Sequence, residues 1–191
     1  MMVISAQEEK LDPRVRRTQA FIQEAFLALL EEKGFQSITV REITERAEIN
    51  RSTFYAHYPD TYGLLDATLQ DIFRKELEHN ALSVCHYSLE NVRALMITVC
   101  KFIRQSQSNC KTPDSQFELM IEKQVRKQSQ ALLEMWLEKL GADLDVKSVA
   151  VATSWTIYGL AAQWNQDSKR PAVEVYTDRV LPLITANLPG D

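Results

Sequence analysis

The stretch TVREITERAEINRSTFYAHYP, residues 39–59, decides the fold of the N-terminal part of the chain. Thr39 and Glu42 have the spacing of a capping box, in which a hydroxyl and a carboxylate each satisfy a free amide at the start of a helix. That helix is short, because Asn50 is a good N-cap for the next one. The next helix stops near Tyr58, since a residue before proline avoids the helical conformation. The sequence therefore predicts two short helices joined by a tight turn.

Longer helices flank this pair. Asp12 can cap the preceding helix, Pro13 suits its first helical position, and apolar residues recur at helical spacing until Gly34. Asp60 caps a following helix that carries leucines along one side. Residues 12–58 thus form a three-helix unit of the helix-turn-helix type, whose second short helix can enter the major groove of DNA.

The rest of the chain has helical periodicity and few breakers, with no internal repeat and no credible strand. The expected segments are a helix over 89–103, a polar loop over 105–115, one long or two shorter helices over 116–140, a helix from about Asp145 to Gln166, and a last helix from Pro171. The predicted fold class is therefore all-α, with an N-terminal three-helix domain over 12–60 and a helical domain over 61–191.

Composition indicates a globular protein. Hydrophobic residues make up 45% of the 191 residues and charged residues 25%, which excludes collagen-like, low-complexity and wholly disordered chains. The net charge of −4 argues against a protein that coats nucleic acid without specificity, although a local cationic face stays possible.

No cofactor, metal site or membrane anchor is expected. Cys85, Cys100 and Cys110 form no C-x-x-C pair and are odd in number, which favours a reducing cytoplasm over disulfides or zinc. The uncharged stretch 148–166 has too many polar groups for a lone membrane helix. No catalytic motif is present, and His86 beside Cys85 is weak support for a metal site or an activated thiol. We therefore expect no catalytic residues.

Within this frame, a specific set of residues resembles the DNA-binding domain of TetR-family regulators over about residues 14–65. The resemblance is carried by Gly34-Phe35, Thr39-Val40, Ile43, Ala47, the run Ile49 to Pro59, and Leu64-Leu65. It implies that Asn50 caps the recognition helix, that Arg51 and Ser52 face base edges, and that Phe54, Phe35, Ile38, Ile43, Ala47 and Ile49 are core. The implied DNA-binding residues are Thr39, Asn50, Arg51, Ser52, Thr53, Tyr55, His57 and Tyr58, of which Tyr58 stands where the family usually has Phe.

Two positions depart from the family pattern. Glu48 lies where the turn usually has glycine, and Thr61 lies where many relatives place a phosphate-binding lysine. A basic cluster, Arg14, Arg16 and Arg17, stands at the start of the first helix. The family reading puts this cluster beside the DNA backbone, and the alternative is a solvated, poorly ordered end.

The resemblance also implies an effector pocket and a dimer interface in the helical domain. Large adaptable side chains there are candidates for lining the pocket, although most such residues are simply core. The candidate ligand-binding residues are Met96, Cys100, Phe117, Met120, Trp155 and Tyr158. An uncharged helix over 148–166 is expected to be buried all round, and it pairs with 171–188 in a four-helix bundle between two copies. The candidate interface residues are Trp155, Gly159, Ala162, Val180 and Ile184.

These features together predict a ligand-responsive transcriptional repressor that binds a near-palindromic operator as a homodimer. Its partners are double-stranded DNA, a second copy of the chain and a small-molecule effector. A helical protein-interaction module that has lost DNA binding is the alternative, motivated by the net acidity, Glu48 and Thr61. A small helical enzyme is a third possibility, but the chain lacks a set of nucleophile, base and orienting group.

Overall fold

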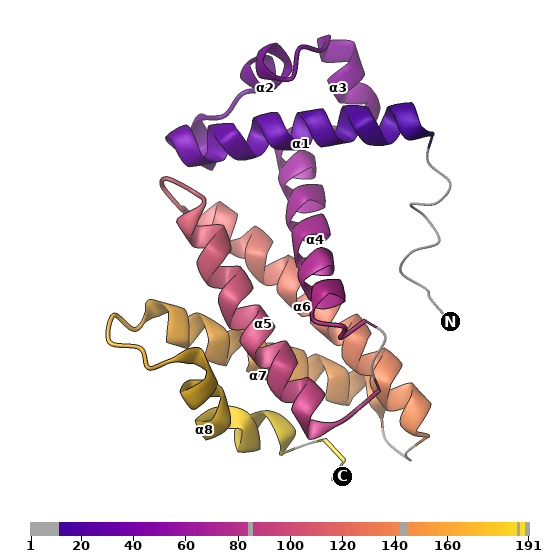
Figure 1. Ribbon diagram of the computed structural model, residues 1–191, viewed down its shortest axis with the longest axis vertical. Coiled ribbons are helices and arrows are strands. Elements are labelled where there is room, and N and C mark those ends of the chain that lie inside the picture. The colour runs from indigo at the N-terminus through magenta and orange to yellow at the C-terminus, as the bar shows by residue number, and fades with distance from the viewer. Residues whose placement is uncertain (1–11, 84–85, 142–144, 187, 190–191) are drawn as a thin grey trace. The chain divides into compact units, whose positions relative to one another are not determined.

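The computed structural model describes residues 12–83, 86–141, 145–186 and 188–189, and it confirms an all-α fold in that part of the chain (Figure 1). No strand occurs among these residues. The helices, in chain order, are α1 (Pro13–Lys33), the 3-10 helix η1 (Phe35–Ser37), α2 (Val40–Arg46), α3 (Arg51–His57), α4 (Thr61–His79), α5 (Leu89–Ser108), α6 (Ser115–Leu140), α7 (Val146–Gln166) and α8 (Val173–Thr185).

The helix starts follow the local capping signals. The Asp12 carboxylate accepts a hydrogen bond from the Arg14 amide at 2.8 Å, and Pro13 occupies the first helical position of α1. Asp60 accepts from the Gly63 amide at 2.7 Å at the start of α4. Each of these short polar side chains satisfies an amide that the helix itself leaves free.

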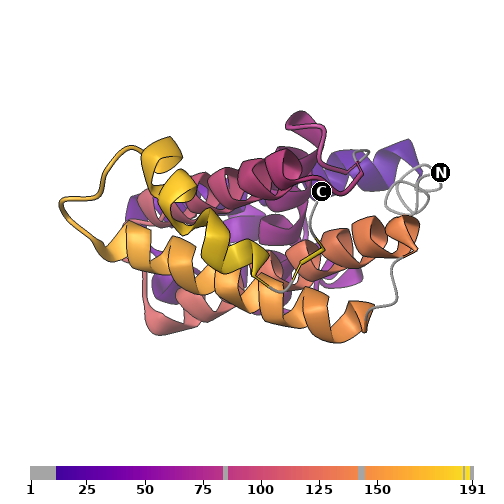
Figure 2. The ribbon, with the colours of Figure 1, turned by 90° about the horizontal axis from the view of Figure 1, so that it is seen from below.

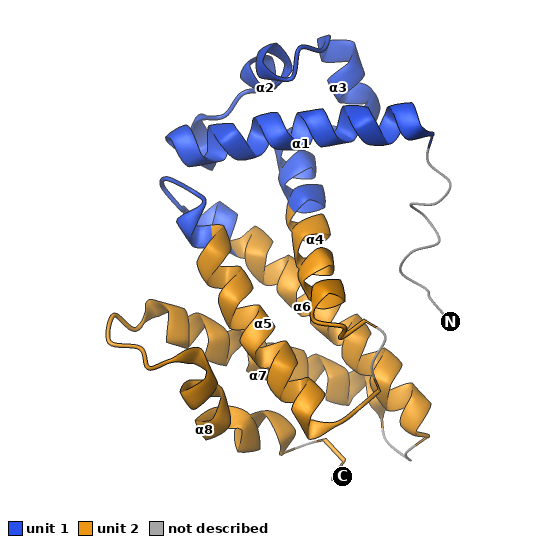
Figure 3. Ribbon diagram, in the orientation of Figure 1, with its two compact units in different colours: residues 1–68, 107–118 blue, residues 69–106, 119–191 orange. Residues whose placement is uncertain are grey.

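The chain divides into two compact units, coloured separately in Figure 3. Unit 1 contains the described residues up to Thr68 together with Gln107–Glu118, and unit 2 contains Leu69–Ser106 with the described residues from Leu119 onward. The chain therefore passes from one unit to the other within α4, near the end of α5 and within the first turn of α6.

Three of the expected boundaries shift. The residues from Gln105 to Ser108 continue α5, so the connection to α6 is only 109–114 and not the whole stretch 105–115. No glycine or proline interrupts the helix before Pro113, and polar residues on an exposed face do not stop a helix. The stretch over 116–140 is one helix, and the last helix begins two residues after Pro171.

Unit 2 is built from α5 to α8 and the second part of α4. The Phe73 and Phe102 rings join α4 to α5 with their centroids 4.6 Å apart. Helix α8 packs against α7 (Figure 2), and the Tyr176 hydroxyl of α8 donates to the Leu160 carbonyl of α7 at 2.9 Å. Fully buried apolar side chains such as Trp136 fill the space between these helices.

Candidate nucleic-acid interface

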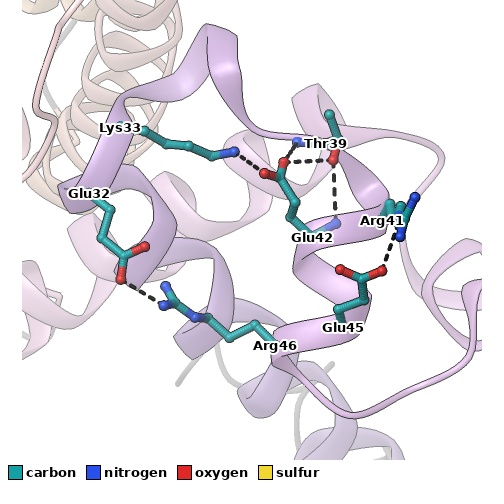
Figure 4. A network of polar contacts seen from close by, with 7 residues as sticks. All are labelled: Glu32, Lys33, Thr39, Arg41, Glu42, Glu45 and Arg46. Atoms are coloured by element: carbon teal, nitrogen blue, oxygen red, sulfur yellow. Dashed lines mark hydrogen bonds and ion pairs between the residues drawn. The ribbon is translucent and has the colours of Figure 1, made fainter.

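Helix α2 starts with the predicted capping box, which is complete (Figure 4). The Glu42 amide donates to the Thr39 hydroxyl at 3.3 Å, and one Glu42 carboxylate oxygen accepts from the Thr39 amide at 3.0 Å and from its hydroxyl at 2.7 Å. The other oxygen accepts from Lys33 of α1. These hydrogen bonds, that from Lys33 first and those from Thr39 next, lower the pKa of Glu42 from 4.5 to about 2.

The cations of α2 are engaged by carboxylates (Figure 4). Arg41 pairs with Glu45 at 2.7 Å within the helix, and Arg46 pairs with Glu32 of α1 at 2.7 Å. Hydrogen bonding to these carboxylates raises the pKa of both guanidinium groups. Helix α2 is thus anchored to the last turn of α1 through its charges, and it offers little free positive charge to a nucleic acid.

The turn between α2 and α3 has the left-handed residue that the family pattern supplies with glycine. Glu48 has a φ of +53°, and the Ile49 amide donates across the turn to the Thr44 carbonyl at 3.0 Å. A side chain in this conformation costs about 1–2 kcal/mol relative to glycine. The departure at Glu48 therefore leaves the turn geometry in place but strained.

Helix α3 has one buried and one exposed face. Phe54 is fully buried, whereas Arg51, Ser52 and Tyr55 are exposed, with 56% of Tyr55 accessible. These three exposed side chains lie at positions 1, 2 and 5 of the helix, which places them on one side. Thr53 and His57 are half-buried along the edge of this face.

Three details differ from the expectations for this region. Asn50 is at the N-cap of α3, but its side chain makes no capping hydrogen bond; only its carbonyl accepts, from the Thr53 and Phe54 amides. Tyr58 is only 6% exposed and packs on the Phe54 ring at a centroid distance of 5.9 Å, so its ring belongs to the core. Ala47 and Ile49 are half-buried, because the turn lies at the edge of the unit. Phe35, Ile38, Ile43 and Phe54 are core as expected.

The basic cluster lies on the exposed first turns of α1. Arg14, Arg16 and Arg17 are exposed and form no ion pair with other described residues, while Arg17 lies over the Phe21 ring with its guanidinium carbon 5.4 Å from the ring centroid. Arg51 of α3 is likewise without an ion pair in the described part of the chain. Lys111 of the loop before α6 is also exposed and unpaired among the described residues, so these four arginines and Lys111 are the cations of unit 1 that a phosphate backbone can meet without breaking an existing pair.

The candidate ligand residues of the helical domain have different degrees of burial. Met96, Cys100 and Phe117 are fully buried, Met120 and Tyr158 are half-buried, and Trp155 is 49% exposed. Burial raises the pKa of the Cys100 thiol to about 12. Phe117 belongs to unit 1, whereas the other five belong to unit 2.

Helix α7 has an exposed side in the single chain, and burial of that side by a second copy stays a prediction. Five uncharged residues recur every three or four positions along its exposed side: Ser148, Val151, Trp155, Gly159 and Gln163. We call this set the α7 stripe. Ala162 is half-buried beside it. Val180 and Ile184 of α8 are buried within the protomer itself, and the exposed apolar residues of that helix are Val175 and Leu183.

The structure also shows features that periodicity does not reveal. The Arg126 guanidinium lies 3.6 Å from the centroid of the Trp155 ring, which joins α6 to α7 by a cation–π contact. A surface groove of about 390 Å³ in unit 1 is lined by α1 residues and by Arg46, Ala47 and Glu48. Contacts between residues so far apart in the sequence leave no spacing signal.

Two negative findings concern the described residues only. They contain no group of three or more histidine, cysteine, aspartate or glutamate side chains that could hold a metal ion. None of their helices has both the length and the apolar character needed to cross a bilayer. The suggested pairing of His86 with Cys85 falls partly outside the described residues, because Cys85 is not among them.

The helix-turn-helix geometry agrees with the sequence comparison. Residues 22–68 match the sequence pattern of the bacterial regulatory proteins of the tetR family. These residues, about a quarter of the chain, have the DNA-binding sequence pattern of that family. The match covers α2 and α3 in full, together with the buried half of α1 and the start of α4.

One curated relative is also similar to part of this chain. It is an uncharacterized HTH-type transcriptional regulator, YxbF, of Bacillus subtilis strain 168, and it is 38% identical over 73 residues. Those residues are 38% of this chain but only 19% of the relative, so the likeness is confined to a minor part of that protein.

Solved structures extend the likeness in fold to the helical domain. The fatty acid degradation regulator FadR of Bacillus halodurans has a TM-score of 0.59 and 16% identity, covering 95% of this chain and 100% of its own. The regulator FadR of Bacillus subtilis, solved in complex with stearoyl-CoA, has a TM-score of 0.57 and 13% identity, covering 89% of this chain and 99% of its own. At this level of identity the likeness concerns the fold.

Proposed function

We propose that this chain is a transcriptional repressor of the tetR family that binds a near-palindromic DNA operator as a homodimer and responds to a small-molecule effector. The observation that carries the proposal is the exposed face of α3. Its one buried side chain, Phe54, fixes the helix on the unit, while Arg51, Ser52 and Tyr55 point to solvent. A recognition helix needs this division between an anchoring face and a face that can meet base edges.

The chemistry of this face suits duplex DNA. The Arg51 guanidinium has no competing carboxylate among the described residues, and it has the planar donor pair that reads guanine in the major groove. Thr53, Tyr55 and His57 supply the hydroxyl and imidazole donors that position a protein on phosphates. We leave Tyr58 out of this surface because its ring is buried. We leave Thr39 out because its hydroxyl already donates a hydrogen bond to the Glu42 carboxylate.

Selection from random duplex DNA tests the proposal directly. The wild-type chain should enrich a sequence with two related half-sites, and Arg51→Ala should lose about 1–3 kcal/mol of discrimination at one position of each half-site. Arg41→Ala is the matched control, because this arginine is paired with Glu45 within α2. The control should leave base preference unchanged. If the wild-type chain enriches no sequence at moderate salt, the chain is not a sequence-specific DNA-binding protein.

We place the homodimer contact on the α7 stripe. The exposed side of α7 has no charged residue from Ser148 to Gln163, and the Arg126 guanidinium already covers one face of the Trp155 ring. A large aromatic ring with a fixed orientation is the type of residue that dominates interface energy. Val175 and Leu183, the exposed apolar residues of α8, extend the surface in place of Val180 and Ile184.

We place the effector among the helices of unit 2, near Met96, Cys100, Met120 and Tyr158. Buried polar atoms without a partner in the described residues are available there for a ligand: Ser129 Oγ, Trp136 Nε1, Thr153 Oγ1 and Thr177 Oγ1. Such groups are costly to leave unpaired, so a ligand that pairs with them gains affinity. The Bacillus subtilis regulator, solved in complex with stearoyl-CoA, is a protein of this fold with a bound ligand that has a long acyl chain.

A thermal-shift screen of uncharged and acyl-chain compounds tests the effector proposal. A compound present at a hundred times its Kd should stabilise the chain by about 2.7 kcal/mol. The same compound should change operator affinity by an amount that corresponds to a coupling of about 1–3 kcal/mol. A compound that binds without changing operator affinity is not the effector.

The rival function, a helical protein-interaction module, keeps two observations in its favour. Glu48 is exposed in the turn of the helix-turn-helix unit, and Thr61 gives α4 no cation at the position where relatives use one. The DNA selection separates the two proposals, since an interaction module enriches no operator.

A further inference from the structure

The surface groove of unit 1 lies between one side of α1 and the turn that follows α2. Its α1 wall is formed by residues three and four positions apart, which therefore share one side of the helix: Phe21, Glu24, Ala25 and Ala28. The first and the last of them are about two helical turns apart, which is roughly 10 Å along the axis. The volume of about 390 Å³ lies in the range of sites for small molecules.

Most of the groove lining is apolar. Ala25 is buried, Ala28 and Ala47 are half-buried, and their single methyl groups leave the hollow between the two walls unfilled. Phe21 is 42% exposed, although it is a large apolar side chain. The Arg17 guanidinium carbon lies 5.4 Å from the centroid of the Phe21 ring, so this ring already has contact with a cation of the chain itself. The groove can thus hold an apolar body, and an aromatic one can pack against Phe21.

The free charge of the groove is negative. Arg46 is the one cation among the residues that line it, and Glu32 binds its guanidinium at 2.7 Å (Figure 4). Glu24 and Glu48 are exposed and form no ion pair with other described residues. One of these carboxylates comes from α1 and the other from the turn, so each wall supplies one. A ligand in the groove meets two uncompensated negative charges, which attract a cation and repel an anion.

The carboxylate on the turn stands where glycine is usual. Glu48 has the positive φ of +53° described above, and a non-glycine residue in this conformation is strained. Glycine would relieve the strain and would leave this wall of the groove without a charge. The residue type at position 48 is therefore what gives the groove a carboxylate on both sides.

We propose that this groove binds an organic cation, in which a protonated amine or a quaternary ammonium group is joined to a flat apolar ring system. The ring system packs against Phe21 and the alanines, and the ammonium group lies near the carboxylates of Glu24 and Glu48. All of these residues belong to unit 1. The site is therefore different from the effector site that we place in unit 2, and it does not depend on the proposed binding to DNA.

Three naphthalene compounds of similar size and different charge test the chemistry of the site. At neutral pH 1-naphthylmethylamine is a cation, 1-naphthylmethanol is uncharged and 1-naphthylacetate is an anion. NMR spectra of the isotope-labelled full chain should show saturable shifts of the Ala28 and Glu48 amides with the amine. The Kd should be about 1 mM or lower, as expected for about a dozen non-hydrogen atoms. At low salt the alcohol should bind about threefold or more weakly and the anion more weakly again, since an exposed ion pair contributes a factor of a few.

The double variant Glu24→Gln, Glu48→Gln keeps the shape of the groove and removes both charges. It should weaken binding of the amine about fivefold or more and leave the affinity for the alcohol unchanged. Glu118→Gln is the matched control, because Glu118 is also an exposed carboxylate of unit 1 without an ion pair among the described residues, but it does not line the groove. The control should bind all three compounds as the wild-type chain does.

Ala28→Leu tests the location of the site in a second way, because a larger side chain at this position fills the groove. It should weaken binding of both the amine and the alcohol, and thermal unfolding checks that the variant is folded. If it does not fold, the glutamine variants still decide, since both lie at exposed positions. Equal affinity for the amine and the alcohol overturns the proposal, because the groove is then only apolar. Unchanged binding of the amine in the double variant, or no saturable shift at Ala28 and Glu48 with any compound, overturns it as well.

Discussion

The substitution Gly159→Glu should leave the folded protomer stable and should weaken its proposed association into a dimer. Gly159 lies in the middle of the α7 stripe, and a Cβ atom added there meets no atom within 4 Å. The single chain therefore has room for a glutamate. Replacing a glycine inside an exposed helix also stabilises that helix by about 0.5 kcal/mol or somewhat more, because the unfolded chain loses conformational freedom. The protomer should unfold at the same temperature or slightly higher.

The proposed dimer should respond in the opposite way. In a two-fold interface the same surface meets itself, so each complex would bury two new carboxylates. Burial of one unpaired charge costs about 3–5 kcal/mol, which by the conversion of 1.4 kcal/mol per tenfold corresponds to a dimer Kd raised by at least about a hundredfold. Loss of the second half-site contact should then weaken operator binding sharply.

Sedimentation over a concentration series, together with thermal unfolding, measures both effects. Ala131→Glu is the matched control, because Ala131 is exposed in the middle of α6, within the same unit, with Lys127 one turn before it. Gly159→Glu should sediment as a folded particle of half the dimer mass, whereas Ala131→Glu should remain a dimer. A dimer of unchanged affinity in the Gly159→Glu chain would refute the placement of the interface, and an unfolded chain would refute the exposure of Gly159.

Three further predictions concern single side chains. The pKa of Glu42 is lowered to about 2 in the folded chain, so the stability that its carboxylate contributes is present above pH 4.5 and is lost as the pH falls toward 2. Urea unfolding should therefore show that the difference in free energy of unfolding between wild type and Glu42→Gln becomes smaller over that range. A difference in free energy of unfolding that does not change with pH would mean that Lys33 does not bind this carboxylate in solution. Thr61→Lys should steepen the salt dependence of operator binding by about one unit per protomer, as filter binding at several salt concentrations can show, and an unchanged slope would place Thr61 away from the phosphates. Burial raises the pKa of the Cys100 and Cys110 thiols, so mass spectrometry should find both alkylated far more slowly in the folded chain than in urea, and equal rates would contradict their burial.

The starts of α1, α2, α4 and α7 could be predicted from the sequence because each depends on neighbouring residues. Asp12, Thr39 with Glu42, Asp60 and Asp145 all accept amide hydrogen bonds within three residues of their own positions. The pattern of a short polar residue followed by a helical run therefore contains the whole interaction. The positions at which helices end are harder to predict, as in α5, because polar residues such as Gln105 are compatible with both a helix and a loop.

The contacts between distant segments could not be predicted in this way. Nothing near Gly34 in the sequence indicates that Thr112 packs on it, and nothing near Trp155 indicates that Arg126 covers its ring. The division of α7 into a buried and an exposed side also depends on which helices it packs against. An uncharged helix predicts apolar surroundings, but it does not distinguish a partner within the chain from a second copy of the chain.

The net acidity of the chain and its proposed binding to DNA are compatible because some cations of unit 1 are paired with carboxylates and others are free to contact phosphates. Lys33, Arg41 and Arg46 are held by carboxylates on α1 or α2, which fixes α2 and removes these cations from the surface available to phosphate. On α1 and α3 the unpaired cations are Arg51 and the cluster Arg14, Arg16 and Arg17, so a proposed dimer that contacts phosphates through these arginines alone should have a salt-dependence slope of about −7. The acidic remainder of the chain disfavours binding to arbitrary DNA, whereas Arg51 lies on α3, the helix that we propose as the recognition helix. A protein with weak electrostatic attraction to DNA in general and one guanidinium that can contact bases should discriminate between sequences and should not bind every sequence tightly.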